Sequence, residues 1–363
     1  MTERVVIMAG GTGGHVFPAL AIAHRLRAMG VEILWLGTRG RLEEELVPRH
    51  HYDIAYIDVR GLRRNGLRRK LGAPFMIARA VAQARRVLRD FDPAVVLGMG
   101  GYASGPGGLA AWLLGIPVVL HEQNAAAGLT NRLLSRVASR ILLGFPGAFA
   151  GPRVRVVGNP VREEIAALRG RERPDFRRSA LHVLVLGGSL GAAALNELVP
   201  RALQLLAASG AALEVVHQCG REHVQNTSAH YEGAAFAVQV TPFIEDMARA
   251  YLGADLVICR AGALTVSEIT AAQVPALFIP LPTAVDDHQY KNAMTLAGSG
   301  AGLCIRQGDL QEQGLCEVLR DLWEDRSRLE AMHERLCALP ASDACAEVVA
   351  ELGAFFASGQ QAS

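Results

Sequence analysis

Two glycine-rich turns lie half a chain apart, and each follows a short apolar run and precedes a segment with helical periodicity. The first belongs to VVIMAGGTGGH, from Val5 to His15, and the second to VLVLGGSLG, from Val183 to Gly191. A turn between a strand and a helix presents backbone N–H groups and the positive end of the helix dipole to an anion. One such turn is equally well explained by a backbone that needs positive φ angles. Two in equivalent positions favour two Rossmann-like domains facing each other, with a phosphorylated ligand between them.

Neither turn carries the dinucleotide fingerprint. The pattern G-x-G-x-x-G, counted from Gly11, reaches Val16 where it requires its last glycine. The pattern also needs an acid about 20 residues later, at the end of the next strand, to bind the ribose. The strands predicted at 32–36 and 213–217 both end without one. The sequence therefore disfavours a nicotinamide oxidoreductase.

Short apolar runs alternate with helical segments along the whole chain. The runs do not alternate between apolar and polar residues, which is typical of parallel sheets covered on both faces. The fold class predicted is α/β, with two parallel sheets and right-handed crossovers. The predicted strands are Val5–Met8, Ile33–Leu36, Ile54–Ile57, Val95–Leu97, Val118–Leu120 and Ile141–Leu143, then Val183–Leu186, Leu213–His217, Phe236–Val240, Leu256–Cys259, Ala276–Ile279 and Leu303–Ile305.

The predicted domain boundary lies in Val157–Arg162, where Pro160 forces the preceding residue out of the helical conformation. The polar segment Leu168–Arg178 that follows is expected to be an exposed excursion. The predicted domains are residues 1–160 and 161–343, with a last helix at about 344–357 that packs back on the first domain.

Charge and composition limit the class of protein. The chain has 363 residues and a net charge of only +2, which argues against a general nucleic-acid binder. The start, Met1–Arg4, leads directly into a strand, so no signal peptide is expected, and no apolar run reaches the ~18 residues of a membrane span. The six cysteines show no metal-ligand spacing and predict reduced, buried thiols in a cytoplasmic protein.

One region is strongly basic. Arg60–Arg89 holds ten cations and no acid, and Leu71, Phe75 and Met76 lie among the cations. An apolar patch rimmed by cations is attracted to an anionic membrane surface, by about 1 kcal/mol per nearby cation. The alternative is a solvated basic helix face. Nucleic acid is disfavoured, because apart from Phe75 the region has no aromatic residues for stacking.

The segment from Cys259 to Glu268 has a strand, a turn of small residues and a helix start. Thr265 and adjacent N–H groups there are candidates for a diphosphate, and Glu268 for two ribose hydroxyls. The competing interpretation is a capping box, in which Thr265 and Glu268 bind only the N–H groups of their own helix. Downstream, Pro280–Asn292 has the composition of a binding loop, and its Asp286-Asp287 pair is not the D-x-D of a metal-chelating sugar-nucleotide enzyme.

Other polar residues follow strands of the N-terminal half. Gly98–Pro106 is a third glycine-rich turn, and the quartet His121–Asn124 ends another strand. His121 and Glu122 are candidates for catalysis or for orientation and capping. His15, directly after the first turn, is a candidate general base, a diphosphate contact or a helix-start residue without chemistry.

Together these segments resemble the MurG family of bacterial peptidoglycan glycosyltransferases over nearly the whole chain. The matching segments are AGGTGGHVFPALA at Ala9–Ala21, GMGGYASGPGG at Gly98–Gly108, HEQN at His121–Asn124, GNPVR at Gly158–Arg162, GGSLGA at Gly187–Ala192 and RAGALTVSE at Arg260–Glu268. The resemblance implies the GT-B fold and transfer of N-acetylglucosamine (GlcNAc) from UDP-GlcNAc to lipid I, undecaprenyl-pyrophosphoryl-MurNAc-pentapeptide, which gives lipid II. It also implies a peripheral enzyme on the cytoplasmic face of the inner membrane, with other cell-wall enzymes as candidate partners.

The resemblance also implies roles for single residues. On the C-terminal domain, Ser189 would contact the diphosphate, Ile244 the uracil, Glu268 the ribose and Gln289 the sugar hydroxyls. The other donor contacts implied there are Ala263, Leu264, Thr265, Val266 and Ser267. From the N-terminal domain the implied donor contacts are Thr12, Gly13, Gly14, Asn124 and Arg162, and the acceptor-side residues are His15, Tyr102 and Glu122. Two segments depart from the family pattern, Leu190 in place of a frequent Gln and the loop Thr283–His288, and both concern the sugar contacts.

The implied reaction is an inverting displacement in which a base deprotonates the acceptor hydroxyl and UDP leaves. Helix N-termini and Arg162 are expected to stabilise the leaving diphosphate, so no cofactor is required and a divalent metal is not predicted. His15 is the first candidate for the base, because the ordinary pKa of histidine suits proton transfer near neutrality, and Glu122 is the second. The alternatives are a UDP-GlcNAc epimerase, another GT-B glycolipid glycosyltransferase and a non-catalytic nucleotide-sugar binding module.

Overall fold

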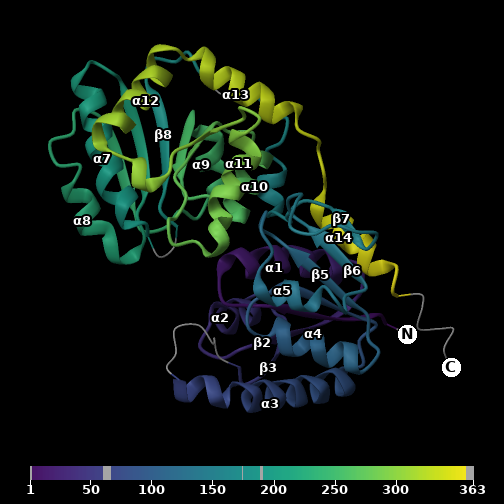
Figure 1. Ribbon diagram of the computed structural model, residues 1–363. Coiled ribbons are helices and arrows are strands. Elements are labelled where there is room, and N and C mark those ends of the chain that lie inside the picture. Colours follow the sequence, from purple (N-terminus) through teal and green to yellow (C-terminus); the bar gives the residue numbers. More distant parts are fainter. Residues whose placement is uncertain (1, 60–66, 174, 189–190, 357–363) are drawn as a thin grey trace. The chain divides into compact units, whose positions relative to one another are not determined.

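The computed structural model describes residues 2–59, 67–173, 175–188 and 191–356, with the side chains of 67–73 and 285 left out. The chain forms two compact units (Figure 1). Unit 1 comprises Met1–Arg162 with Ser342–Ser363, and unit 2 comprises Glu163–Ala341. The C-terminal segment therefore belongs to the same unit as the N-terminal domain.

Unit 1 is built on a parallel sheet with the strand order β3-β2-β1-β4-β5-β6-β7. The order reverses between β1 and β4, and in open α/β sheets ligands bind outside the carboxyl ends of the strands at such a switch point. The strands are β1 (Arg4–Ala9), β2 (Glu32–Gly37), β3 (Asp53–Tyr56), β4 (Val95–Gly100), β5 (Val118–Glu122), β6 (Arg140–Leu143) and β7 (Val154–Val156). The helices are α1 (Gly13–Ala28), α2 (Leu42–Arg49), α3 (Leu67–Phe91), α4 (Ser104–Leu113), α5 (Leu129–Leu134) and α14 (Ala344–Gly353).

Both faces of this sheet are covered, as the unbroken apolar runs predict. On β1, Val5 and Ile7 pack with α1 and α14, whereas Val6 and Met8 pack with α3, α4 and α5. Figure 1 shows α1 and α14 on one side of the sheet and α3 with α4 on the other. Successive side chains of a strand point to opposite faces, so a strand buried on both sides needs apolar residues at every position.

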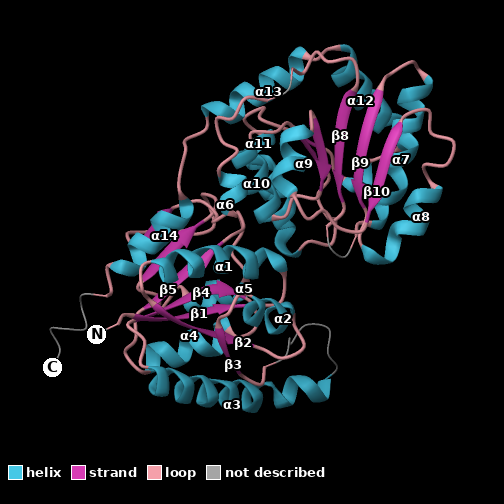
Figure 2. Cartoon of the chain, turned by 180° about the vertical axis from the view of Figure 1, so that it is seen from behind, coloured by secondary structure: helices cyan, strands magenta, loops and turns pink. Residues whose placement is uncertain are grey.

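Unit 2 repeats the architecture with the parallel strand order β10-β9-β8-β11-β12-β13, which reverses between β8 and β11. The strands are β8 (Leu181–Leu186), β9 (Leu213–Gln218), β10 (Ala237–Thr241), β11 (Leu256–Cys259), β12 (Ala276–Phe278) and β13 (Leu303–Cys304). The main helices are α6 (Glu163–Ala166), α7 (Ala193–Ala208), α8 (Val224–Ala229), α9 (Met247–Gly253), α10 (Ala263–Ala272), α11 (His288–Ala297), α12 (Glu312–Glu324) and α13 (Ser327–Ala338). In Figure 2, α7, α8 and α12 lie on one side of this sheet and α9, α10 and α11 on the other.

The predicted α/β class and all twelve predicted strands are confirmed, with small differences at their ends. β7 was not predicted. It lies at the edge of its sheet, pairs only with β6 among the described strands, and contains Arg155 and the exposed Val156. An edge strand faces solvent, so it lacks the apolar run that marks the interior strands.

The prediction of an exposed excursion over Leu168–Arg178 holds for part of the segment: Gly170–Glu172, Asp175 and Arg177 are exposed, whereas Leu168 and Phe176 are buried. Arg178 donates to both oxygens of the buried Asp255, at 3.0 and 2.8 Å. Arg173 donates to the backbone oxygens of Ala272, Tyr251 and Ala254, and burial lowers its pKa to about 10. The arginines of this segment thus fasten it to unit 2, because backbone carbonyls and one buried carboxylate supply their acceptors.

Two other expectations concern thiols and the membrane. Cys219, Cys259 and Cys316 are buried free thiols as predicted, but Cys337 is exposed. Within the described ranges, none of the helices is long and apolar enough to cross a bilayer.

Candidate functional site

The first glycine turn joins β1 to α1. Helix α1 begins at Gly13, and its N-cap residue Thr12 has an extended backbone and makes no side-chain cap bond. The Thr12 carbonyl accepts from the N–H groups of His15 and Val16 at 3.1 and 3.2 Å, which closes the first helical turn. The first N–H groups of a helix have no partner within it, so those of Gly13 and Gly14 are oriented for a ligand.

A buried carboxylate from α2 holds this turn through hydrogen bonds. Glu43 of α2 accepts from the Gly11 N–H at 2.9 Å and from the N–H and hydroxyl of Thr38 at 3.2 and 2.8 Å. A Cβ atom on Gly10 would lie 2.3 Å from a Glu43 oxygen, so a side chain there would displace the carboxylate. One N–H donor of the turn is therefore already engaged by a carboxyl group of the protein itself.

The third glycine turn, between β4 and α4, packs directly against the first. Gly100 and Gly101 have φ angles of 101° and 91°, which disfavour any other residue. A Cβ atom on Gly101 would lie 2.5 Å from the Gly10 carbonyl oxygen, and one on Gly100 would lie 2.7 Å from the His15 ring. The two turns touch backbone to backbone, and the imidazole of His15 lies on Gly100.

His15 has a side-chain partner from a third strand. Its Nδ1 lies 3.2 Å from Oε1 of Gln123, which follows β5. Gln123 is buried, and its Nε2 donates to the Met99 carbonyl at 2.9 Å. The first turn, the third turn and the end of β5 are thus joined at His15, as expected for the carboxyl edge of a parallel sheet.

His121 and Glu122 lie beside this group and are engaged within unit 1. His121 is fully buried, its Nε2 lies 2.9 Å from the Gly158 carbonyl, and burial lowers its pKa to about 4, so it is neutral near pH 7. Glu122 accepts from the N–H and side-chain amide of Asn124 at 3.1 and 3.2 Å. It also accepts from the Gly128 N–H at 3.0 Å and from the Asn131 amide at 2.8 Å. This geometry favours orientation and capping over catalysis for both residues, and it leaves His15 as the stronger candidate base.

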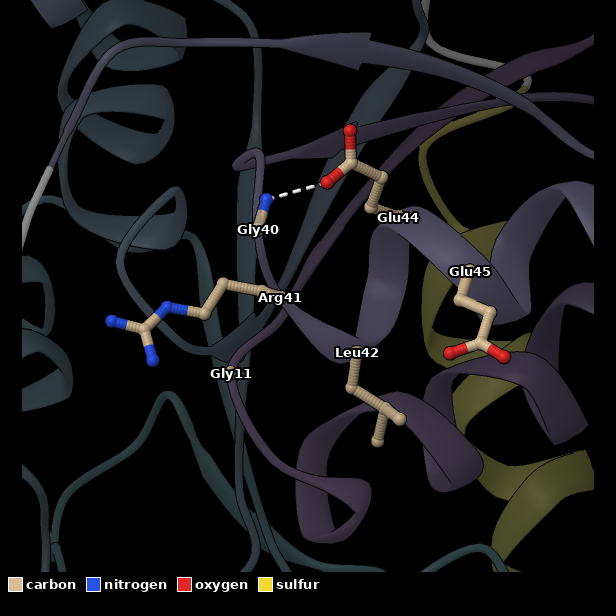
Figure 3. A pocket seen from close by; sticks show the side chains of 6 residues that line it. All are labelled: Gly11, Gly40, Arg41, Leu42, Glu44 and Glu45. Carbon is tan, nitrogen blue, oxygen red and sulfur yellow. Dashed lines mark hydrogen bonds between the residues drawn. The ribbon is translucent and has the colours of Figure 1, made fainter.

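A shallow pocket opens beside the first turn, between Gly11 and the start of α2 (Figure 3). In Figure 3 the side chain of Arg41 points away from those of Glu44 and Glu45. The Arg41 guanidinium lies 5.2 Å from the ring centre of Tyr102, a residue implied to be on the acceptor side. Gly40 donates its N–H to Glu44 and so closes the loop before α2.

In unit 2, neutral groups hold the second glycine turn. The Gly187 N–H donates to the Gln218 carbonyl at 2.8 Å. Asn196 of α7 donates to the Cys219 carbonyl at 2.9 Å, and its oxygen lies 3.1 Å from Nε2 of His217. Burial lowers the pKa of His217 to about 4, so this residue is also neutral. The predicted diphosphate contact Ser189, together with Leu190, lies outside the described residues.

The small-residue turn after β11 leads into α10, and it does not form the capping box. Gly262 is the N-cap residue and makes no side-chain cap bond, which places Thr265 inside the first helical turn and Glu268 one turn further on. Ser267 donates to the Ala263 carbonyl at 2.9 Å, and Val266 is fully buried in the unit. Among the implied donor contacts of α10, Val266 therefore belongs to the core, whereas Leu264 and Thr265 are partly exposed.

Glu268 is buried, and the Tyr251 hydroxyl donates to its Oε2 at 3.0 Å. This hydrogen bond holds one carboxylate oxygen of Glu268 in place and so sets the direction of the other oxygen. The turn itself is held by Asn292 of α11, whose amide donates to the Ala261 carbonyl at 3.1 Å, and by Arg260, which donates to the Ile279 carbonyl and to Gln307 at 3.0 and 2.7 Å.

The loop before α11 departs from ordinary backbone geometry. Asp286 and Asp287 both have φ angles of 54°. Left-handed non-glycine residues carry strain and often occur at ligand sites. Arg306 binds Asp287 at 2.8 Å and lies 3.6 Å from the ring centre of Tyr290. Gln289, implied to contact sugar hydroxyls, accepts from the Leu281 N–H at 2.9 Å.

The structure thus gathers the predicted residues in two groups. Unit 1 brings together Thr12, Gly13, Gly14, His15, Tyr102, Glu122 and Asn124 at the carboxyl ends of β1, β4 and β5, with Arg162 at the end of the unit. Unit 2 carries Ile244 after β10, Ala263–Glu268 on α10 and Gln289 on α11. Sequence reasoning did not predict Glu43, Gln123 or Asn292, although Gln123 lies inside the HEQN motif. No group of three metal-ligating side chains occurs among the residues that the structure describes.

Known proteins are similar to this chain over nearly its whole length. Residues 5–143 match the Glycosyltransferase family 28 N-terminal domain, and residues 182–348 match the Glycosyltransferase family 28 C-terminal domain. An Aeromonas hydrophila protein named UDP-N-acetylglucosamine–N-acetylmuramyl-(pentapeptide) pyrophosphoryl-undecaprenol N-acetylglucosamine transferase is 53% identical over 363 residues, 99% of each chain. The chain belongs to the MurG transferases of glycosyltransferase family 28.

Further relatives agree with this membership. A Tolumonas auensis transferase of the same name is 52% identical over 97% of this chain and 99% of its own. The crystal structure of Acinetobacter baumannii MurG shares 42% of its sequence with this transferase, with a TM-score of 0.83 over 97% of this chain and 99% of that one. The resemblance seen in the motifs and the GT-B fold are thereby confirmed, and the transferase interpretation is supported over the epimerase and oxidoreductase alternatives.

Proposed function

We propose that this MurG-family transferase moves GlcNAc from UDP-GlcNAc to lipid I and so forms lipid II. The observation that carries the proposal is 53% identity over 99% of the chain with a transferase named for this donor sugar and acceptor. The match leaves out almost nothing of either chain, so donor and acceptor chemistry are expected to be shared.

Unit 2 is the proposed donor side. Glu268 is buried on α10, after the small-residue turn that follows β11. Tyr251 orients its carboxylate, and this orientation suits two ribose hydroxyl donors. Thr265 and the first N–H groups of α10 are proposed to bind the diphosphate, with Ser189 of the second glycine turn. Ile244 is proposed to bind the uracil through its backbone and Gln289 the sugar.

Unit 1 is the proposed acceptor and base side. His15 Nε2 removes the proton from the acceptor hydroxyl as that oxygen forms a bond to the anomeric carbon. The bond from this carbon to the diphosphate oxygen breaks, its electron pair leaves with UDP, and the configuration inverts. Positive helix ends and Arg162 stabilise the charge on the diphosphate, so the step needs no metal in this account.

The test is transfer of radiolabel from UDP-GlcNAc to a lipid I analogue. Label in the lipid supports the proposal. Formation of UDP-ManNAc would indicate an epimerase, and a donor that binds but stays unchanged would indicate a binding module. Transfer to other glycolipids in place of lipid I would shift the proposal to a different glycolipid glycosyltransferase.

We further propose that the face formed by α3 and α4 binds an anionic membrane on its cytoplasmic side. Phe75 of α3 is 79% exposed, and Trp112 and Leu113 of α4 are 50% and 49% exposed. These two helices pack on each other, and the Arg60–Arg89 region supplies the cations, although residues 60–66 and the side chains of 67–73 lie outside the described part. Exposed apolar side chains beside cations suit insertion at an anionic headgroup layer.

Charge reversal tests this proposal. Replacing Arg68, Arg69 and Lys70 by Glu is expected to release the protein from anionic vesicles in sedimentation. The matched control reverses three exposed arginines of unit 2, Arg221, Arg249 and Arg335, and is expected to leave binding largely unchanged. Sedimentation insensitive to both the α3 variant and salt would remove the electrostatic part of the proposal.

A further inference from the structure

Gln123 lies next to His15, and its hydrogen-bond partners are compatible with only one orientation of its side-chain amide. Its Nε2 donates to the Met99 carbonyl at 2.9 Å, and its own backbone carbonyl accepts from the Asn159 amide at 3.0 Å. The Met99 carbonyl is available because the pairing of β1 with β4 shifts register there: Met8 pairs with Gly98 and Ala9 with Gly100, so Met99 is skipped. The irregularity in the sheet thus creates the acceptor that holds the glutamine.

The orientation of this amide decides which ring nitrogen of His15 carries hydrogen. Turning the amide over would place Oε1 against the Met99 carbonyl oxygen, and two acceptors would then face each other without a proton. Oε1 therefore faces His15 Nδ1 at 3.2 Å, and a carbonyl oxygen can only accept. His15 consequently carries its hydrogen on Nδ1 in the neutral state, and its lone pair lies on Nε2.

The ring is held on another side as well. The imidazole lies so close to Gly100 that a Cβ atom there would be 2.7 Å from Nδ1 and Cε1, and 3.3 Å from Nε2. Contact with Gly100 and the bond to Gln123 together restrict both the rotation and the tautomer of the ring. A nearby titratable group, His121, stays neutral near pH 7 because burial lowers its pKa to about 4.

We propose that Gln123 is a positioning residue that fixes His15 in the tautomer able to act as the general base. This inference rests on the proposed function of His15. When Nε2 takes the proton of the acceptor hydroxyl, the ring becomes a cation with hydrogen on both nitrogens. The bond from Nδ1–H to the Gln123 oxygen then becomes charge-assisted and strengthens. A neutral amide gives this support without placing a carboxylate at the base.

Substitution of Gln123 by Met tests the proposal, because Met has a similar length and neither donates to Met99 nor accepts strongly from His15. Gln204→Met is the matched control, since Gln204 donates to the His230 carbonyl within unit 2 and has no proposed role in the reaction. We expect Gln123→Met to lower kcat about 10²-fold, the order of loss for a misplaced catalytic group. UDP-GlcNAc affinity is expected to change less than about twofold. Gln123→Glu keeps an acceptor for Nδ1–H and is expected to recover part of kcat.

Nitrogen NMR of histidine-labelled protein gives a direct readout that a merely structural role would not move. The wild type is expected to show His15 protonated on Nδ1, and Gln123→Met is expected to shift the ring toward protonation on Nε2. A wild-type ring protonated on Nε2 would overturn the proposal even if the variant fails to fold. Unchanged kcat in Gln123→Met would also overturn it. If His15→Ala keeps kcat while the wild-type ring is protonated on Nδ1, the proposed base fails and the structural assignment of the tautomer stands.

Discussion

The two glycine turns that first suggested a paired fold are held by different chemistry. The first turn lies on a buried carboxylate, because Glu43 accepts the Gly11 N–H at 2.9 Å, and it leads into a helix that carries His15. The second is held by neutral groups, the Gln218 carbonyl on Gly187 and the Asn196 amide on the Cys219 carbonyl. The carboxyl group of Glu43 engages one N–H group of the first turn that would otherwise be open to an anion, whereas backbone carbonyl and amide groups hold the second turn. We therefore expect the same strand-turn-helix element to support proton transfer in one unit and nucleotide binding in the other.

The largest effect is expected at the first turn. His15→Ala removes the proposed base and should lower kcat roughly 10²–10⁴-fold, while UDP-GlcNAc affinity stays nearly constant. The acidic limb of the pH–rate profile should vanish in the variant, because the group whose protonation causes it is gone. If kcat is unchanged and only the KM for the acceptor rises, His15 is a binding residue. The first turn would then have no role in proton transfer.

The second largest effect is expected at Glu43, whose carboxyl group holds the first turn, and it concerns the free energy of unfolding. Glu43→Gln replaces an oxygen that accepts N–H bonds by an amide nitrogen, which leaves a buried donor facing a donor. The free energy of unfolding should fall by about 2–3 kcal/mol, measured by urea denaturation. Glu45→Gln is the control on the same helix, since that carboxylate is exposed and pairs with the exposed Arg49. Equal effects of the two substitutions would show that the buried charge does not hold the turn.

The two buried histidines should make both units sensitive to acid. Burial lowers the pKa of His121 in unit 1 and of His217 in unit 2 from 6.5 to about 4. Between these pH values the unfolded chain binds protons that the folded chain does not, so the free energy of unfolding falls as pH falls from about 6.5 toward 4. From pH 7 to pH 5 the loss should be about 2 kcal/mol per histidine. His121→Gln and His217→Gln should each remove one such contribution from urea titrations at the two pH values, and an unchanged pH dependence would contradict the assignment.

The sequence predicted the order and position of the strands and helices better than it predicted the contacts between their side chains. Apolar runs such as Val5–Met8 mark interior strands, and the carboxyl ends of these strands gave most of the candidate residues. Gln123 was not singled out, because its role depends on the skipped residue Met99, and a register shift between two strands leaves no local signal. Glu43 was missed because its partners, Gly11 and Thr38, come from two other loops.

Charged residues misled the sequence analysis where they are paired inside the fold. The segment Leu168–Arg178 is predicted to be exposed because it is polar and charged. Part of it is exposed, yet Arg178 pairs with Asp255, whose side chain is 1% exposed. The spacing of Thr265 and Glu268 alone is compatible with a capping box. The helix instead begins after Gly262, and that boundary depends on how the small-residue turn leaves β11.

The division of labour between the two units is tested most directly by calorimetric titration of UDP-GlcNAc into wild type, Glu268→Gln and His15→Ala. Glu268→Gln should bind about tenfold more weakly, because a neutral amide replaces a charge-assisted acceptor for the ribose, while its melting temperature stays close to wild type. His15→Ala should bind the donor within about twofold of wild type. Unchanged donor binding in Glu268→Gln, with a marked loss in His15→Ala, would contradict the account.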